Sequence, residues 1–191
     1  QEAPLWMRYC ALSPDGTTIA FTYKGDIYTV PSTGGRATQI TTNPAFDTTP
    51  VWSPDGKQIA FASDRMGSLD VFVVPQRLTT HSGSEKPVAY KDDKHILFTA
   101  NIAPSAEDAG FPSGQFQQIY EVAVTGGRPT MFSSMPMECI SINKEGVMLY
   151  QDKKGYEDYW RKHQVSPIAR DIWSYTPGKT PVYQKQTTFG G

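Results

Sequence analysis

The residues that could carry out catalysis are few and scattered along the chain. There are three histidines, His81, His95 and His163. Two serines follow His81 closely, and Asp92 and Asp93 precede His95, but a Ser-His-Asp triad needs spatial convergence and an oxyanion hole. The chain also lacks the Gly-x-Ser-x-Gly elbow of hydrolases. We therefore assign no catalytic residue, and the sequence predicts that this chain is not itself an enzyme.

Metal ligands are equally sparse. No two histidines are close in sequence, and neither Cys10 nor Cys139 has a histidine or a second cysteine nearby, whereas zinc sites group such ligands. Asp92 and Asp93 could contact a cation, but solvated carboxylates in a degraded turn explain them better. The sequence predicts no metal and no cofactor.

An internal repeat defines the elements that would position any site. Ser13-Pro14-Asp15-Gly16 returns 40 residues later as Ser53-Pro54-Asp55-Gly56, and Ile19-Ala20-Phe21 returns as Ile59-Ala60-Phe61. A period of about 40 residues with short β-rich segments is typical of a β-propeller. Two degenerate units follow, and no segment has the apolar periodicity of a helix.

We therefore expect an all-β propeller of four-stranded blades, with four blades in one domain over residues 1–191. The approximate blades are 8–42, 48–80, 86–133 and 138–188. They form either a closed ring or part of a propeller with about six or seven blades. An open fragment would leave two unpaired edges that invite association.

The turn residues of the repeat have a structural explanation. Proline presets φ at the second position of a type I turn, Asp15 and Asp55 suit the third position, and Gly16 and Gly56 close the turn.

A second set of residues also recurs. Asp26, Asp70 and Asp171 occupy matching positions of three units, and Asp64 and Arg65 precede Asp70. A role in substrate binding is conceivable. Recurrence in three units favours a structural role, in which the carboxylates accept hydrogen bonds from turn amides and pair with arginine.

Two departures from the repeat are informative. The second unit passes from Val74-Pro75 directly to Gln76, without the Gly-Gly turn of the first and third units. Either that turn is shortened or a loop is missing between Pro75 and Gln76, and we favour the missing loop. The third and fourth units carry insertions at 101–117 and 152–170, and inserted loops on a rigid scaffold often carry binding function.

The second insertion is the candidate interaction surface. Its charged and aromatic residues are Tyr156, Glu157, Asp158, Tyr159, Trp160, Arg161, Lys162 and His163. Aromatic residues and arginine anchor interfaces, so this segment could contact a peptide or a neighbouring domain. Alternatively, Tyr156 and Trp160 pack on the blade while Glu157 pairs with Arg161.

Cys10 and Cys139 fall in the first strands of the first and fourth units. A disulfide could fasten a ring of four units, and an oxidising compartment would favour it. First strands of adjacent blades diverge, however, and a disulfide needs Cα atoms within about 7 Å. We favour two separate buried thiols.

Composition excludes several classes of protein. Formal net charge is −1, without the basic cluster that nucleic acids select, and no apolar run approaches a membrane span. Gln1-Glu2-Ala3-Pro4 reads as a mature amino terminus after signal-peptide removal. We therefore expect a periplasmic or secreted protein.

The two clear repeats resemble the WD40-like repeats of TolB-type propellers. Leu5 to Tyr28, Asp64 to Gly67 and Gly155 to Trp173 resemble, more specifically, the amino-terminal propeller of tricorn-like serine peptidases of the S41 type, notably those of Bacteroidetes. The resemblance implies further domains, including a PDZ-like domain and a Ser/His peptidase domain, in a longer parent protein. No catalytic motif of that family has a counterpart here.

These observations favour a non-catalytic module of a secreted or periplasmic tricorn-like peptidase. Its channel or faces would gate or orient peptide substrates, and it would dock downstream peptidase domains of the same chain. The alternative is a stand-alone TolB-like propeller that binds envelope proteins. A sugar-acting or metal-dependent propeller enzyme has no supporting residues.

Overall fold

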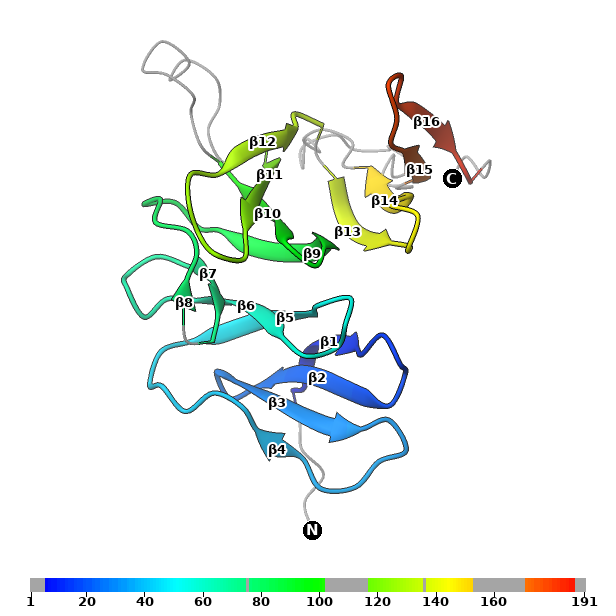
Figure 1. The fold of residues 1–191 in the computed structure, drawn as a ribbon. Helices are drawn as coiled ribbons and strands as arrows, with labels where there is room; N and C mark the ends of the chain where they lie inside the picture. Colours follow the sequence, from blue (N-terminus) through cyan, green and yellow to red (C-terminus); the bar gives the residue numbers. More distant parts are fainter. Residues whose placement is uncertain (1–5, 75, 102–116, 136, 153–170, 188–191) are drawn as a thin grey trace, which may run out of the picture.

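The computed structural model describes residues 6–74, 76–101, 117–135, 137–152 and 171–187. These residues form four antiparallel sheets, each with four strands in sequence order (Figure 1), and no helix occurs within the described ranges. The predicted fold class, an all-β propeller of four-stranded blades with four blades in this chain, is confirmed.

The strands have the following bounds. Blade 1 consists of β1 (Arg8–Leu12), β2 (Thr18–Tyr23), β3 (Asp26–Pro31) and β4 (Thr38–Gln39). Blade 2 consists of β5 (Asp47–Trp52), β6 (Ile59–Ser63), β7 (Asp70–Val73) and β8 (Gln76–Arg77). Blade 3 consists of β9 (Lys86–Asp92), β10 (His95–Ala100), β11 (Gln118–Ala123) and β12 (Thr130–Ser133). Blade 4 consists of β13 (Met137–Ile142), β14 (Met148–Asp152), β15 (Ile172–Thr176) and β16 (Val182–Lys185).

The first strand of each blade lies at the centre of the molecule. β1 packs against β5, β5 against β9, and β9 against β13. The fourth strands β4, β8, β12 and β16 form the opposite edge of each sheet. Figure 1 shows the four blades following one another in an arc, and no comparable packing joins β13 back to β1 in the described part of the chain.

An aromatic pair recurs between the second and third strands of each blade. The pairs are Phe21 with Tyr28, Phe61 with Phe72, Phe98 with Tyr120, and Tyr150 with Trp173. In the first three pairs the ring centroids lie 5.9 to 6.1 Å apart. In blades 2 to 4 the face that carries the pair packs against the preceding blade, and we call it the upstream face; the other is the downstream face.

Each interface between neighbouring blades, called a seam here, joins an upstream aromatic face to smaller side chains. Phe61 and Phe72 pack with Ile27 of blade 1. The pair Phe98 and Tyr120 packs with Ala60, Val71 and Val73 of blade 2. Tyr150 and Met148 pack with Leu97 and Ile119 of blade 3. Because successive side chains in a strand point to opposite faces, a blade between two neighbours must be apolar on both faces.

The hairpin of blade 2 corrects one expectation. Val73 lies opposite Gln76, and Phe72 lies opposite Arg77, so β7 and β8 pair with only Val74 and Pro75 between them. Pro75 itself lies outside the described residues. The shortened turn, and not the missing loop that we favoured, explains the absence of the Gly-Gly sequence.

Candidate functional site

The four inner strands line a cavity of about 1160 Å³. Residues of β1, β5, β9 and β13, together with the turns that follow them, form its wall. The cavity is open on one side and lies where a propeller has its central channel, so we call it the channel. It is the place where residues far apart in the sequence come together.

A β-bulge recurs at the same position in every inner strand. Between regular pairs, two residues of the inner strand oppose one residue of the second strand: Tyr9 and Cys10, Thr49 and Pro50, Pro87 and Val88, and Cys139 and Ile140. Bulges bend a strand and redirect its side chains. The four equivalent bulges therefore place irregular backbone at the same position of each inner strand along the channel.

Three of these bulges hold a non-glycine residue in the left-handed region. The φ angles are 54° at Tyr9 and 52° at both Thr49 and Cys139. For a β-branched residue such as Thr49 this conformation is a genuine outlier, and its hydroxyl is buried without a hydrogen-bond partner among the described residues. Backbone strain of this kind is typical of functional sites.

The channel wall combines apolar and charged side chains. Leu12, Trp52 and Ile142 supply apolar surface, whereas Asp92, Asp93 and Lys144 are charged residues of both signs in its lining. The Trp52 indole Nε1 donates a hydrogen bond to the Ala11 carbonyl at 3.0 Å, which fixes the ring across the seam between blades 1 and 2. Such a wall suits a flexible ligand with both apolar and polar groups, and a peptide is one.

Cys10 and Cys139 both line this channel, but they are free and exposed. The preference for separate thiols over a disulfide is confirmed. The expectation that the thiols are buried is wrong, because the bulges place both residues at the channel wall.

The two described histidines have structural contacts. His81 Nδ1 accepts a hydrogen bond from the Gly83 amide at 3.0 Å. His95 Nδ1 lies 2.9 Å from Asp92 Oδ1. Burial opposes the ionisation of Asp92, but hydrogen bonds from His95 and the Lys94 amide outweigh it and hold the pKa of Asp92 below its usual range. His163 lies outside the described residues.

The Ser-Pro-Asp-Gly turns are closed by their own side chains. Asp15 accepts hydrogen bonds from the Ser13 hydroxyl at 2.6 Å and from the Thr17 amide at 3.0 Å. Asp55 is bonded in the same way to Ser53 and Lys57, at 2.6 and 3.1 Å. The serine hydroxyl is the main cause that lowers the pKa of each carboxyl.

Gly16 and Gly56 complete these turns. Their φ angles are 73° and 71°, which glycine adopts at no steric cost. Each glycine amide donates a hydrogen bond of 2.9 Å to the carbonyl of the serine three residues earlier.

Asp26, Asp70 and Asp171 occupy equivalent places at the start of a third strand. Each carboxylate contacts a side chain of the fourth strand: Gln39 at 3.0 Å, Arg77 at 2.8 Å and Lys185 at 2.9 Å. In each of these three blades, the backbone amide of the residue after the aspartate donates a hydrogen bond to a threonine hydroxyl. The acceptors are Thr41, Thr79 and Thr187, at 2.9, 2.9 and 3.1 Å. These contacts join the third strand to the end of the blade.

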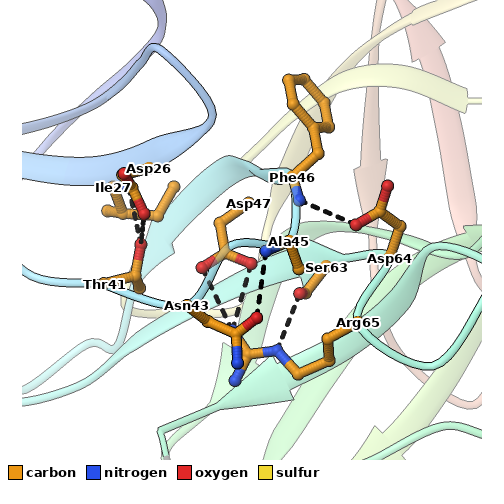
Figure 2. A network of polar contacts seen from close by, with 10 residues as sticks. All are labelled: Asp26, Ile27, Thr41, Asn43, Ala45, Phe46, Asp47, Ser63, Asp64 and Arg65. Carbon is orange, nitrogen blue, oxygen red and sulfur yellow. Dashed lines mark hydrogen bonds and ion pairs between the residues drawn. The ribbon is translucent and has the colours of Figure 1, made fainter.

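Asp64 and Arg65 do not bind each other (Figure 2). Asp64 Oδ1 accepts the Phe46 amide at 2.7 Å. Arg65 Nη2 lies 3.1 Å from both oxygens of Asp47, and its Nε donates to the Ser63 hydroxyl at 2.8 Å. The guanidinium also stacks on Phe72, 4.5 Å from the ring centroid. The two residues thus fasten the segment between blades 1 and 2 to the end of β6.

The sequence-based predictions do not include Asp47 or the three threonines. The threonines follow the fourth strands of blades 1, 2 and 4, in the sequences Ile-Thr-Thr, Leu-Thr-Thr and Gln-Thr-Thr, and this recurrence is a usable signal. Asp47 had no local signal, because its partner Arg65 comes 18 residues later. The predicted interaction surface, Tyr156 to His163, lies outside the described residues and stays a prediction.

Neither a metal cluster nor a membrane-spanning segment is found in the described part of the chain. Its histidines, cysteines and carboxylates form no group of three or more that could hold a metal ion. None of these residues forms a helix of the length and apolarity needed to cross a membrane.

Comparison with known proteins gives the family. A family model described as the tricorn protease N-terminal beta propeller domain matches residues 4–188. The chain is 34% identical over 178 residues to Tricorn protease homolog 1 of Streptomyces coelicolor, which covers 90% of this chain and 16% of that protein.

Two further likenesses agree with this match. The "Putative Tricorn-like protease N-terminal subunit" of Sulfurisphaera tokodaii is 23% identical over 189 residues, covering 92% of this chain and 91% of that protein. The crystal structure of TolB from Acinetobacter baumannii has a TM-score of 0.65 at 19% identity, covering 95% of this chain and 43% of that chain, which shows a common fold. On the family match and the identity to the Streptomyces protein, the chain belongs to the tricorn protease N-terminal β-propeller family.

Proposed function

We propose that this chain is the non-catalytic propeller of a tricorn-like serine peptidase and that peptides enter its central channel. The observation that carries the proposal is the cavity of about 1160 Å³ between four inner strands, in a chain of this family. The chain spans 16% of its Streptomyces relative, so the proteolytic activity of a longer parent protein is part of the proposal.

The chemistry of the channel supports a role in admitting or orienting peptides. Trp52 and Ile142 offer apolar contacts, Lys144 offers charge to backbone carbonyls or acidic side chains, and Asp93 offers charge to basic ones. Lys91 also belongs to the lining, but its ammonium group is paired with Glu121 of β11 at 2.6 Å. A wall of this kind binds many sequences weakly, as a passage requires.

The test is to obstruct the channel with one side chain. Ser141 is exposed and lines the channel, so Ser141→Trp should narrow it without filling a core position. Ser134 is also exposed but does not belong to the channel wall, and Ser134→Trp is the matched control. Binding of fluorescent peptides to the 191-residue chain is measured by anisotropy.

We expect Ser141→Trp to weaken peptide binding by about tenfold, equivalent to about 1.4 kcal/mol, while Ser134→Trp leaves it unchanged. In the parent peptidase, the same substitution should lower kcat/KM for long peptides more than for short ones. Equal binding by both variants would mean that peptides do not use the channel. Binding of an envelope protein, but of no peptide, would support the TolB-like alternative.

Docking of downstream domains rests on the predicted surface from Tyr156 to His163. Aromatic and arginine side chains suit an interface. If replacement of Tyr156 and Trp160 by serine lowers the affinity for the downstream domains, the surface is a contact site. If only stability falls, the two rings serve the blade.

A periplasmic or secreted location is also part of the proposal. Fractionation of the source cells tests it, and recovery of the protein solely in the cytoplasmic fraction would contradict it.

A further inference from the structure

Glu85 is a buried acid in the seam between blades 2 and 3. The residue is 0% exposed, and its amide donates to the Leu69 carbonyl at 2.6 Å immediately before β9. Neither carboxylate oxygen forms a well-aligned hydrogen bond with a described residue, although the Thr79 hydroxyl and the His81 backbone are near enough to favour the charged form in part. A carboxylate in this state is costly, because an ion loses its hydration without compensation.

The repeat supplies a matched comparison for Glu85. Asp47, also 0% exposed, begins β5 two residues before its bulge, and Glu85 likewise stands two residues before the bulge of β9. The Asp47 amide donates to the Gly25 carbonyl at 2.7 Å. Gly25 stands before Asp26 as Leu69 stands before Asp70. The chain therefore places a buried acid at the same point of two successive seams.

The two acids differ in their cation. Asp47 binds Arg65, which comes two residues after the end of β6. The corresponding residue after the end of β10, two positions beyond Ala100, is an isoleucine in the sequence. In the described part of the chain, Glu85 thus has no counterpart to the guanidinium that neutralises Asp47.

The groups around Glu85 do not replace that guanidinium. Asp70 of β7 is a second buried carboxylate, and Arg77 of β8 is already paired with it at 2.8 Å. Burial, and then the Asp70 charge, raise the pKa of Glu85 to about 7, against the opposing effects of the Thr79 hydroxyl, the His81 backbone and Arg77. The described residues offer no third acid, histidine or cysteine that would make a metal site here.

We propose that Glu85 is a proton-binding site in the seam between blades 2 and 3, neutral while the seam is closed, and that loss of its proton weakens this seam. The facing groups are Asp70 of β7, Arg77 of β8, and Thr79 and His81 of the segment between β8 and β9. Protonation is the remaining way to remove the charge, since Arg77 serves Asp70. The stability of the seam between blades 2 and 3 therefore depends on pH. At the equivalent place between blades 1 and 2, Asp47 has Arg65 as a permanent counter-ion.

The sign of the effect follows from linkage. The carboxyl holds its proton more tightly in the folded chain than in the unfolded chain, whose pKa is about 4.3. The stability that this group contributes is fully present below that value and is lost as the pH rises through the folded pKa of about 7. At higher pH the free energy of unfolding no longer depends on this group's proton. Over this interval, one proton changes the folding equilibrium by about tenfold for each pH unit.

The experiment compares the wild-type chain with Glu85→Gln by urea unfolding between roughly pH 4 and pH 9. Glutamine has the shape of the neutral acid and does not titrate. Glu145→Gln removes an exposed glutamate and is the matched control. The ratio of the folding constants, wild type to Glu85→Gln, should fall by about tenfold per pH unit and level off near neutrality. A ratio that is constant with pH would overturn the proposal.

A second measurement does not depend on the variant folding. In wild-type chain labelled with ¹³C at the glutamate carboxyls, the Glu85 resonance should titrate near neutrality, and a midpoint of an ordinary exposed glutamate would overturn the proposal. Calcium or magnesium chloride is then added at constant ionic strength and high pH. Stabilisation of wild type but not of Glu85→Gln would show that a cation, and not a proton, neutralises the site, which also overturns it.

Discussion

At the scale of single residues, stability depends on how each buried charge is neutralised. Asp47 is wholly buried, and Arg65 reaches both of its oxygens while stacking on Phe72 (Figure 2). A buried ion pair contributes little net stability, but removing one partner is expensive because the other charge is left without compensation. The pair therefore fastens the start of β5 to the end of β6 within blade 2.

Arg65→Ala should destabilise the chain by about 3–5 kcal/mol, because it leaves the Asp47 carboxylate buried and unpaired. Urea unfolding at neutral pH measures the loss. Arg36 is exposed, so Arg36→Ala is the control and should stay within about 0.5 kcal/mol of wild type. A loss for Arg65→Ala as small as that of the control would show that the pair contributes nothing to folding.

The sequence could identify Arg65 as structural, but not its partner. The recurring pattern predicts that Arg65 pairs with the recurring carboxylates, whereas the structure pairs it with Asp47. Asp47 begins β5 and lies opposite Ser63 at the end of β6, so the contact closes the open end of one hairpin within blade 2. The register of that hairpin, which residue types alone do not give, decides which acid meets Arg65.

At the scale of elements, the turns were readable and the bulges were not. Proline, aspartate and glycine each have a defined preference within a type I turn. The left-handed φ of Tyr9, Thr49 and Cys139 occurs at residue types that avoid this region. Because packing of the inner strands imposes the conformation, residue type carries no sign of it.

The Ser-Pro-Asp-Gly turns should contribute to acid sensitivity. Hydrogen bonds, chiefly from Ser53, lower the pKa of Asp55 in the folded chain. Stability from this carboxylate is present above the pKa of the unfolded chain and is lost as the pH falls through the folded pKa. Asp55→Asn should therefore show a shallower loss of stability on acidification than wild type.

Acid titration followed by circular dichroism checks this expectation. Asp93 is exposed in the degraded turn of blade 3, and Asp93→Asn serves as the control. If Asp55→Asn and Asp93→Asn lose stability with acid as steeply as wild type, the hydrogen bonds of the Asp55 turn do not stabilise the ionised form.

At the scale of the whole molecule, the three seams have separate hydrophobic clusters. Contacts within a propeller run mainly between neighbouring blades, as in other repeat proteins, whose stability is a sum of unit and interface terms. Leu97 of blade 3 is 0% exposed and belongs to the seam with blade 4. Damage at Leu97 should therefore be felt first in blade 4.

Leu97→Ala should cost about 2–5 kcal/mol through lost burial and the cavity that remains. Hydrogen exchange in the native state measures where this loss falls, and amides of β14 and β15 should lose protection more than those of β2 and β3. Val71→Ala, in the seam between blades 2 and 3, is the control, and its loss of protection should fall in those two blades. Equal loss of protection in all four blades would show a single cooperative unit.

The architecture was the most predictable level, because four units repeat one pattern of strands and turns. The same repetition is misleading at blade 2, where it predicts a missing loop in place of the short hairpin. A pairing of Val73 with Gln76 needs only two connecting residues. The pattern could not show which connections shorten without breaking the sheet.

The aromatic pair on each upstream face has an evolutionary consequence. Blade 1 carries Phe21 and Tyr28 where later blades place the rings that meet their predecessor. A duplicated blade therefore arrives with one face that fits the blade before it and one that fits the blade after it. Gene duplication can lengthen such a chain one unit at a time without inventing a new interface, so related propellers can differ in blade number while each seam keeps the same chemistry.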